Sequence, residues 1–264
     1  MANYKIVDAD QLDADLATVA EAIREKTGET EKLSFPEGMA SEMDAVFEAG
    51  KKSEYDAFWD FFQQKGTRTD YRYAFAYTPW DDAMFSPKYP LKFVGDASCA
   101  FLATIFKWVD KVLRVDLSEA TNLYWTFRNN QFSKLGKCDL SSAINVIGAF
   151  SILPNLTEIE EIVSRADLPW NKTFQNDIGL ESVTFSGVIG SNGLDFRDSY
   201  KLNKASITSI VNALSASTSG LTVTLSLTAV NNAFETSPGA ADGSASEEWL
   251  TLADTKANWT IALA

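Results

Sequence analysis

The feature that most constrains the fold is a repeat of 21 to 24 residues that begins at residue 89. Five segments open alike, with apolar residues alternating with polar ones, and each opening is offset from the last by 23, 23, 21 and 24 residues. A repeat unit of this length cannot bury its apolar face alone, so neighbouring units must stack. The sequence therefore predicts a solenoid over residues 89–264. The openings are "YPLKFV" from Tyr89, "VLRVDL" from Val112, "LGKCDL" from Leu135, "LTEIEE" from Leu156 and "LESVTF" from Leu180.

Two of the units agree beyond their openings. Both carry "DLS", at 116–118 and 139–141, and Phe127 and Phe150 each lie ten residues after the leucine of that motif. Phe174 has a comparable place in the next unit. We expect a strand over 112–117, a turn over 118–122 and the phenylalanines stacked in the core. One short strand in a unit of 20 to 29 residues is typical of leucine-rich repeats, so the predicted class is α/β with an irregular leucine-rich-repeat solenoid.

The C-terminal units are longer and include helices. Residues 203–217 have a helical apolar stripe, and 221–227 alternate as a strand with apolar residues at every second position. A polar loop rich in Gly and Ala is expected over 231–246, a second helix from Ser246, and a closing strand that contains Trp259, Ile261 and Leu263.

Residues 1–66 predict a helical attachment module of three short amphipathic helices. The first has a stripe spaced by four, three and four residues, which is one face of a helix. Helices this short are marginally stable alone, so the stripe must pack on something, and we interpret it as an assembly contact. An ordinary three-helix cap is the alternative. The stripe consists of Leu12, Leu16, Val19 and Ile23.

Residues 67–88 predict an aromatic junction that caps the repeats. "DYRYAFAY", 70–77, alternates with period two and predicts a half-buried strand. The aromatic face of that strand would consist of Tyr71, Tyr73, Phe75 and Tyr77.

Charge and hydropathy limit the partners. The net charge of −13 argues against nucleic acid, whose phosphates require clustered Lys and Arg, and against an anionic membrane surface. No apolar run approaches the roughly 20 residues of a spanning helix, so membrane insertion is not expected. The first residues, "MANYKIVDADQLDADL", lack the basic and apolar regions of a signal peptide, and we expect synthesis in the cytoplasm without one.

The residue types also limit the chemistry. The chain has no histidine, which removes Ser-His-Asp and Cys-His catalysis and the commonest transition-metal ligand. Cys99 and Cys138 are expected to be small buried residues. A carbohydrate-active enzyme that uses Glu158, Glu160 or Glu161 is one alternative. The simpler interpretation of "TEIEEI" is a solvated strand face, so we expect no enzymatic activity and no cofactor.

One segment of the N-terminal region resembles a known module. Residues 16–46 are similar to a short helical module of phage tail structural proteins, including those of prophages in Gram-positive gut bacteria. In that module an amphipathic helix ends in a Lys-Thr/Gly-Gly turn, and a Leu-x-Phe-Pro sequence begins the next helix. The matching positions are Ile23, Arg24, Lys26, Thr27, Gly28, Leu33, Phe35 and Pro36.

The repeats carry a second resemblance. "VDLSEATNLYWTF", 115–127, is similar to the BspA-type leucine-rich repeats of bacterial surface proteins and phage tail proteins. Residues 180–214, followed by a strand and the closing "NWTIAL", resemble the C-terminal end of such arrays in phage proteins. BspA-type repeats have Cys or Ser at a fixed inner position, and here Cys138 alone comes near that pattern.

Together the resemblances imply a virion protein at the tip of a phage tail, in the baseplate or a tail fibre. Its N-terminal helices would attach to other tail proteins, and its repeats would present a surface to a host cell-surface glycan or protein. Tail tips are built on three-fold or six-fold symmetry, which implies a homo-oligomer or a multi-copy position. A bacterial leucine-rich-repeat surface adhesin is the alternative, and it would need export and anchoring.

Aromatic side chains beside polar groups are the candidate ligand contacts. Their flat faces stack on sugars or on protein side chains. The opposing interpretation is that aromatics at repeated positions fill the solenoid core. The candidates are Trp108, Tyr124, Trp125, Arg128 and Trp170.

Overall fold

The computed structural model describes residues 69–77, 79–80, 91–106, 112–235 and 245–264. All of them belong to a compact unit that begins at residue 63. The predicted helical module of residues 1–66, with its stripe at Leu12, Leu16, Val19 and Ile23, lies outside the described residues, and so does Trp108.

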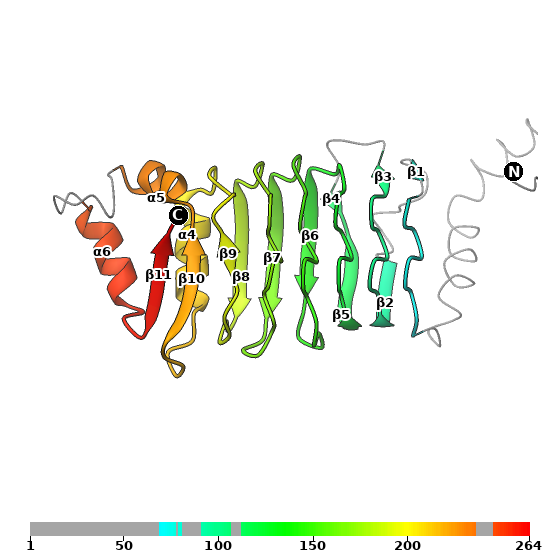
Figure 1. Cartoon of the computed structure of the whole chain (residues 1–264), viewed down its shortest axis with the longest axis horizontal. Helices are drawn as coiled ribbons and strands as arrows, with labels where there is room; N and C mark the ends of the chain where they lie inside the picture. The colour runs from blue at the N-terminus through cyan, green and yellow to red at the C-terminus, as the bar shows by residue number, and fades with distance from the viewer. Residues whose placement is uncertain (1–68, 78, 81–90, 107–111, 236–244) are drawn as a thin grey trace, which may run out of the picture. The chain divides into compact units, whose positions relative to one another are not determined.

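The described residues form about four turns of a parallel β-solenoid (Figure 1). Each turn, here called a coil, contributes one strand to a ladder that we call the strand wall, and this confirms the predicted repeat. Within it, Leu135 pairs with Ile159 and Ile159 with Val183, so equivalent apolar residues form inward-facing rows. The strands are β2 (Leu91–Asp96), β4 (Val112–Leu113) with β5 (Val115–Asn122), β6 (Lys134–Asp139), β7 (Glu158–Ser164) and β8 (Ser182–Gly187).

Opposite the strand wall, each coil forms consecutive tight turns that we call the turn wall. Backbone hydrogen bonds join its coils at every second residue: the Cys99 N–H donates to the Tyr124 carbonyl at 2.8 Å, and the Trp125 N–H donates to the Ile147 carbonyl at 3.1 Å. Two residues of each coil, four positions apart, have left-handed backbone conformations, which cost a side-chain-bearing residue about 1–2 kcal/mol. The hydrogen bonds between coils offset that cost. The left-handed pairs are 73 and 77, 99 and 103, 125 and 129, 148 and 152, and 172 and 176.

The turn wall corrects two sequence predictions. Residues 70–77 are its first coil rather than a strand. Tyr71 and Phe75 are buried as expected, but Tyr73 and Tyr77 have positive φ of 54° and 59° and are 59% and 69% exposed. The four aromatic residues therefore do not share one face. Tyr71 and Phe75 enter the core, and Tyr73 and Tyr77 lie at left-handed turn positions that face the solvent. Residues 118–122, predicted as a turn, continue β5 to its end.

A column of stacked phenylalanines fills the core behind the turn wall. The ring centroids of Phe127 and Phe150 are 5.7 Å apart with planes only 8° from parallel, and those of Phe150 and Phe174 are 5.5 Å apart. This confirms the in-register phenylalanines predicted from the repeat. Each aromatic pair adds about 0.5–1.5 kcal/mol beyond its buried area. The column continues to both sides and consists of Phe75, Phe101, Phe127, Phe150, Phe174 and Phe196.

At the C-terminal end the two walls finish differently. The turn wall continues as a parallel sheet of β9 (Asp195–Phe196), β10 (Leu221–Leu225) and β11 (Trp259–Leu263), which confirms the predicted closing strand. The strand wall ends at helix α4 (Lys204–Ala213), which packs beside β8. Short strands β1 (Pro79–Trp80) and β3 (Ile105–Phe106) pair in parallel near the other end of the described chain.

Two serines of α4 close the free edge of β8. The Ser206 hydroxyl accepts a hydrogen bond from the Val183 N–H at 2.9 Å. The Ser209 hydroxyl accepts from the Phe185 N–H at 2.8 Å and donates to the Phe185 carbonyl at 3.2 Å. Side-chain hydroxyls thus replace the backbone groups of a further strand, and the edge is protected from pairing with another chain.

Two more helices follow β10. Ser226 caps α5 (Leu227–Phe234), and Ser246 caps α6 (Glu247–Asp254), which confirms the helix predicted from Ser246. The predicted loop over 231–246 is wrong in its first residues, because α5 continues to Phe234 and ends at Glu235, which is left-handed; residues 236–244 lie outside the described part. Among the described residues, no helix has the length and apolar content needed to cross a bilayer.

Candidate binding surface on the turn wall

The outward charges of the strand wall are largely paired with each other. Lys134 lies 3.2 Å from the Glu158 carboxylate, Lys137 lies 3.0 Å from Glu161, and Arg114 lies 2.6 Å from Glu160. A hydrogen bond from Ser186 and the ion pair with Lys137 lower the pKa of Glu161. The three glutamates considered as catalytic acids thus each have a cationic partner: Lys134 and Lys137 lie on the neighbouring strand β6, and Arg114 lies one coil further away. A fourth pair joins Lys92 and Glu119.

The turn wall brings three of the predicted contact residues together. Tyr124 and Trp125 stack with ring centroids 4.6 Å apart and planes 18° apart. The guanidinium carbon of Arg128 lies 4.4 Å from the Trp125 ring centroid, within range of a cation–π interaction. All three side chains are half-buried. We call Tyr124, Trp125 and Arg128 the aromatic cluster.

The neighbouring coil makes room for the Trp125 ring. Gly148 has a left-handed backbone (φ 61°), and a Cβ there would lie 2.7 Å from Cδ1 of Trp125 and 2.9 Å from its Nε1. Glycine lets the indole lie directly on the backbone of the next coil. Arg128 is held over the same coil by Ser151, whose hydroxyl accepts from Nη1 at 3.4 Å. The cluster is therefore placed by two coils, and sequence reasoning from one repeat could not reveal this arrangement.

The other two predicted contacts are not part of the cluster. Trp170 is 0% exposed, so its assignment to a binding surface is wrong. It occupies the inward position that Leu123 and Val146 hold in the preceding coils, and its ring packs edge-on against Phe185 with centroids 5.9 Å apart. Trp108 lies outside the described residues.

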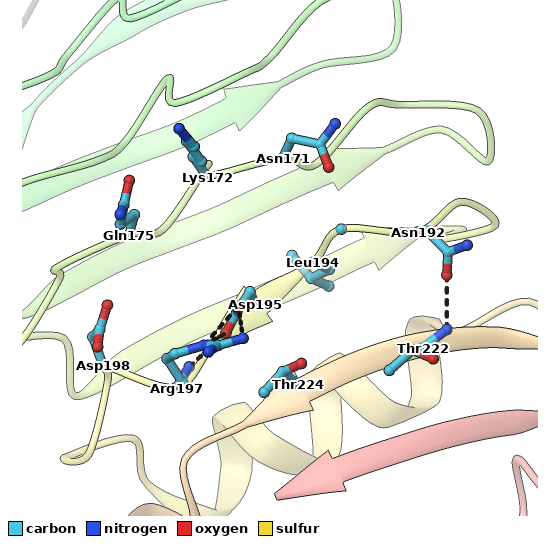
Figure 2. Close-up of a pocket in the computed structure, with 11 residues that line it drawn as sticks. Asn171, Lys172, Gln175, Asn192, Leu194, Asp195, Arg197, Asp198, Thr222 and Thr224 are labelled. Carbon is cyan, nitrogen blue, oxygen red and sulfur yellow. Dashed lines mark hydrogen bonds and ion pairs between the residues drawn. The ribbon is translucent and has the colours of Figure 1, made fainter. Parts of the chain in front are cut away.

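A polar groove further along the turn wall was not anticipated from the sequence. It has a volume of about 720 Å³ and lies where the coil after β7 meets β9 and β10 (Figure 2). Its residues come from three repeat units, and only the register of the folded coils brings them together. The groove is lined by Asn171, Lys172, Gln175, Asn192, Gly193, Leu194, Asp195, Arg197, Asp198, Thr222 and Thr224.

Some of the polar groups of the groove hold its walls in place. Arg197 forms an ion pair with Asp195 at 2.7 Å, and hydrogen bonding to that carboxylate raises the pKa of Arg197. The Thr222 N–H donates to the Asn192 amide oxygen at 2.8 Å, and the Asn176 N–H donates to Asp198 at 2.9 Å. These contacts fix the backbone on three sides of the groove.

Other polar side chains of the groove form no contact that holds its walls. Within the described part of the chain, the side chains of Asn171, Lys172, Gln175 and Thr224 form no hydrogen bond or ion pair. Asn171, Lys172 and Gln175 are exposed, and Thr224 is half-buried. Because these side chains line the groove and are not engaged in hydrogen bonds with other described residues, they are available to a ligand.

The aromatic cluster and the polar groove lie on one continuous surface. Trp125, Gly148 and Lys172 occupy the same left-handed position in three successive coils, with φ of 54°, 61° and 58°. The Gly148 N–H donates to the Asn171 carbonyl at 3.1 Å, which joins the coil under the Trp125 ring to the edge of the groove. Neighbouring strands in a ladder lie about 4.8 Å apart, so two coils place Lys172 about 10 Å from Trp125.

No protein-family model, curated protein or solved structure matches this chain. Among the residues that the structure describes, no three side chains of the His, Cys, Asp or Glu type gather in a way that could hold a metal ion. The chemistry that the surface offers is therefore that of aromatic stacking, amide and hydroxyl hydrogen bonds, and a balanced set of charges.

Proposed function

We propose that the protein is a non-enzymatic structural protein of a phage tail tip, in the baseplate or a tail fibre, that recognises a host-cell surface through its turn wall. Helices within residues 1–66 would attach it to other tail proteins, in a multi-copy or homo-oligomeric position. The repeats would belong to the leucine-rich class. The attachment and virion assignments rest on the sequence resemblances.

The observation that carries the recognition role is the aromatic cluster. The rings of the phenylalanine column are buried in the core. Tyr124 and Trp125, by contrast, stack on each other on the outer side of the same coils. Tyr124 stacks on the Trp125 ring and the Arg128 guanidinium lies over it, so the cluster is held as one rigid group that loses little side-chain entropy on binding. Rigid amphipathic groups of this kind are typical of binding hot spots.

The contrast between the two walls favours the turn wall as the recognition surface. The strand wall presents ion pairs whose charges are already matched within the protein, so few of its outward charges are left for a partner. The turn wall presents an aromatic face and uncommitted amide and hydroxyl groups.

The test is binding of the labelled full-length protein to intact cells of candidate host strains. Trp125→Ala is expected to weaken binding at least tenfold, while Tyr200→Ala, which removes an exposed aromatic ring outside the aromatic cluster, leaves it unchanged. Immunogold labelling of purified phage particles locates the protein. Absence of the protein from tail tips, or equal binding by the Trp125 and Tyr200 variants, would contradict the proposal.

A further inference from the structure

We infer that the polar groove is a saccharide-binding subsite, and that one extended, neutral polysaccharide chain occupies it while contacting the aromatic cluster at Trp125. This inference rests on the proposed recognition role and goes further by naming the ligand class, its charge and its direction along the wall.

The hydrogen-bonding groups of the groove match sugar hydroxyls. Asn171, Gln175 and Thr224 each carry groups that can donate and groups that can accept, as a hydroxyl does. They come from two segments on opposite sides of the hollow, as Figure 2 shows. Leu194 is the one aliphatic side chain larger than alanine among the residues lining the groove. A protein ligand would need apolar pockets for its anchoring side chains, and this groove does not offer them.

The charges favour a neutral ligand. Lys172 and Arg197 are balanced by Asp195 and Asp198, and Arg197 is already paired with Asp195. The net charge of the whole chain is −13, and this charge repels an anionic polymer at long range. A polyanion would meet two carboxylates in the groove and only one cation that is not already paired there.

The position of the groove sets the length and direction of the ligand. From Trp125 the wall passes through Gly148 and Lys172 to Asp195 and then Thr224, which pairs with Asp195. These are four steps of about 4.8 Å, or about 19 Å in all. A ligand that touches both ends must therefore run across the strands, and it must contain several sugar units.

The experiment measures the affinity of the full-length protein for a glycan array. The array holds β-1,4-linked glucose, mannose and N-acetylglucosamine oligomers of increasing length, neutral polysaccharide released from cells that bind the protein, and polygalacturonate as an anionic comparator. The groove variants are Gln175→Ala and Thr224→Val. The matched control is Thr184→Val, which makes the same change at an exposed position of β8 on the strand wall.

For long neutral chains we expect Trp125→Ala and each groove variant to weaken binding, the groove variants about three- to tenfold because each removes one or two hydrogen bonds. A disaccharide cannot span about 19 Å and so cannot contact Trp125 and the groove at once. For disaccharides we therefore expect that either Trp125→Ala or the two groove variants leave the affinity unchanged. Thr184→Val should match the unmodified protein at every length, and this control and both groove variants should keep its thermal unfolding midpoint.

The outcomes separate this inference from the function on which it rests. If Trp125→Ala weakens cell binding while both groove variants bind every glycan normally, the groove assignment is wrong and the recognition role stands. If the unmodified protein binds no cells, the recognition role itself fails. Preference for polygalacturonate, failure to bind any neutral chain, or cell binding that is lost after protease treatment of the cells would each overturn the neutral-saccharide assignment.

Discussion

Arg114 reaches Glu160 across the intervening strand β6, with its two terminal nitrogens 2.7 and 2.6 Å from the two carboxylate oxygens. The contact passes over Gly136, where an added Cβ would lie 3.2 Å from Cγ of Arg114. One glycine thus lets an ion pair join coils that are not neighbours. Because both side chains are partly exposed to water, at 45% and 32%, such a pair contributes at most about 1 kcal/mol.

Two glycines of the strand wall should respond very differently to alanine. At Gly136 the clash is with a flexible side chain, and the loss of the ion pair is offset by the 0.4–1 kcal/mol or so that alanine contributes through the unfolded state. We expect Gly136→Ala to change the free energy of unfolding by less than about 1 kcal/mol. At Gly187, φ is 82° and a Cβ would lie 2.2 Å from the Ser164 carbonyl oxygen, so Gly187→Ala should cost more than about 2 kcal/mol. Urea denaturation measures both, and similar values would contradict the geometry.

The phenylalanine column should behave as a shared element of the solenoid core. Phe150→Ala removes a fully buried ring that stacks on both neighbours and should destabilise the protein by about 3–5 kcal/mol. Tyr77→Ala removes an exposed ring from the same wall and should change stability by less than about 0.5 kcal/mol. The comparison is made by urea denaturation. A loss below about 1 kcal/mol for Phe150→Ala would show that the column is not a principal source of stability.

Asp177 predicts an unusual pH dependence. Its side chain is fully buried, one carboxyl oxygen accepts from the Leu153 N–H at 2.9 Å, and the other has no hydrogen-bond partner. Burial raises its pKa well above the ordinary value near 3.8. Well below pH 3.8 the group is neutral in both states; as the pH rises through that value, the unfolded state ionises while the folded state resists, so folding stability falls. Asp177→Asn should therefore increase stability at pH 7 to 8 and have little effect near pH 3.

The control for this prediction is Asp167, whose pKa is lowered by its hydrogen bond from Arg165. The pH dependence of its effect on stability is opposite. The ionised Asp167 carboxylate stabilises the folded state at neutral pH, and this stabilisation is lost as the pH falls through the lowered pKa. Thermal unfolding of Asp177→Asn and Asp167→Asn between pH 2 and pH 8 provides the measurement. A pH-independent difference for Asp177→Asn would contradict ionisation as the cause.

The closure of β8 by α4 can be tested through its serines. Ser206→Ala and Ser209→Ala each leave a backbone N–H of β8 without its partner, at a cost of about 1–3 kcal/mol. Amide hydrogen exchange at Val183 and Phe185 should accelerate. The double variant should also associate as its concentration rises, because an exposed strand edge pairs with other chains. Asn212→Ala, on the exposed face of the same helix, is the control, and light scattering measures the association.

Sequence periodicity predicted the strand wall well because its signal is local. The alternating openings fell on β2, β5, β6, β7 and β8, and the spacing of Phe127 and Phe150 gave the core column. The turn wall was missed because its left-handed residues, Gly148 apart, are not glycines and are held by hydrogen bonds between coils. Trp125 and Trp170 look alike as isolated aromatics, yet their places in the coil put one on the surface and the other in the core. The groove depends on three units in register, which no single repeat encodes.

The left-handed row of the turn wall has a consequence for variation. At one equivalent position in five successive coils the chain carries Tyr73, Cys99, Trp125, Gly148 and Lys172, with nearly the same backbone angle at each. Because the ladder between coils fixes this angle, the residue type is left open where the side chain faces solvent, as at Tyr73 and Lys172. Cys99, by contrast, is buried, and Gly148 must stay small beside Trp125. Exchange of the exposed side chains keeps the scaffold, so we expect natural variants to differ first at these positions of the row.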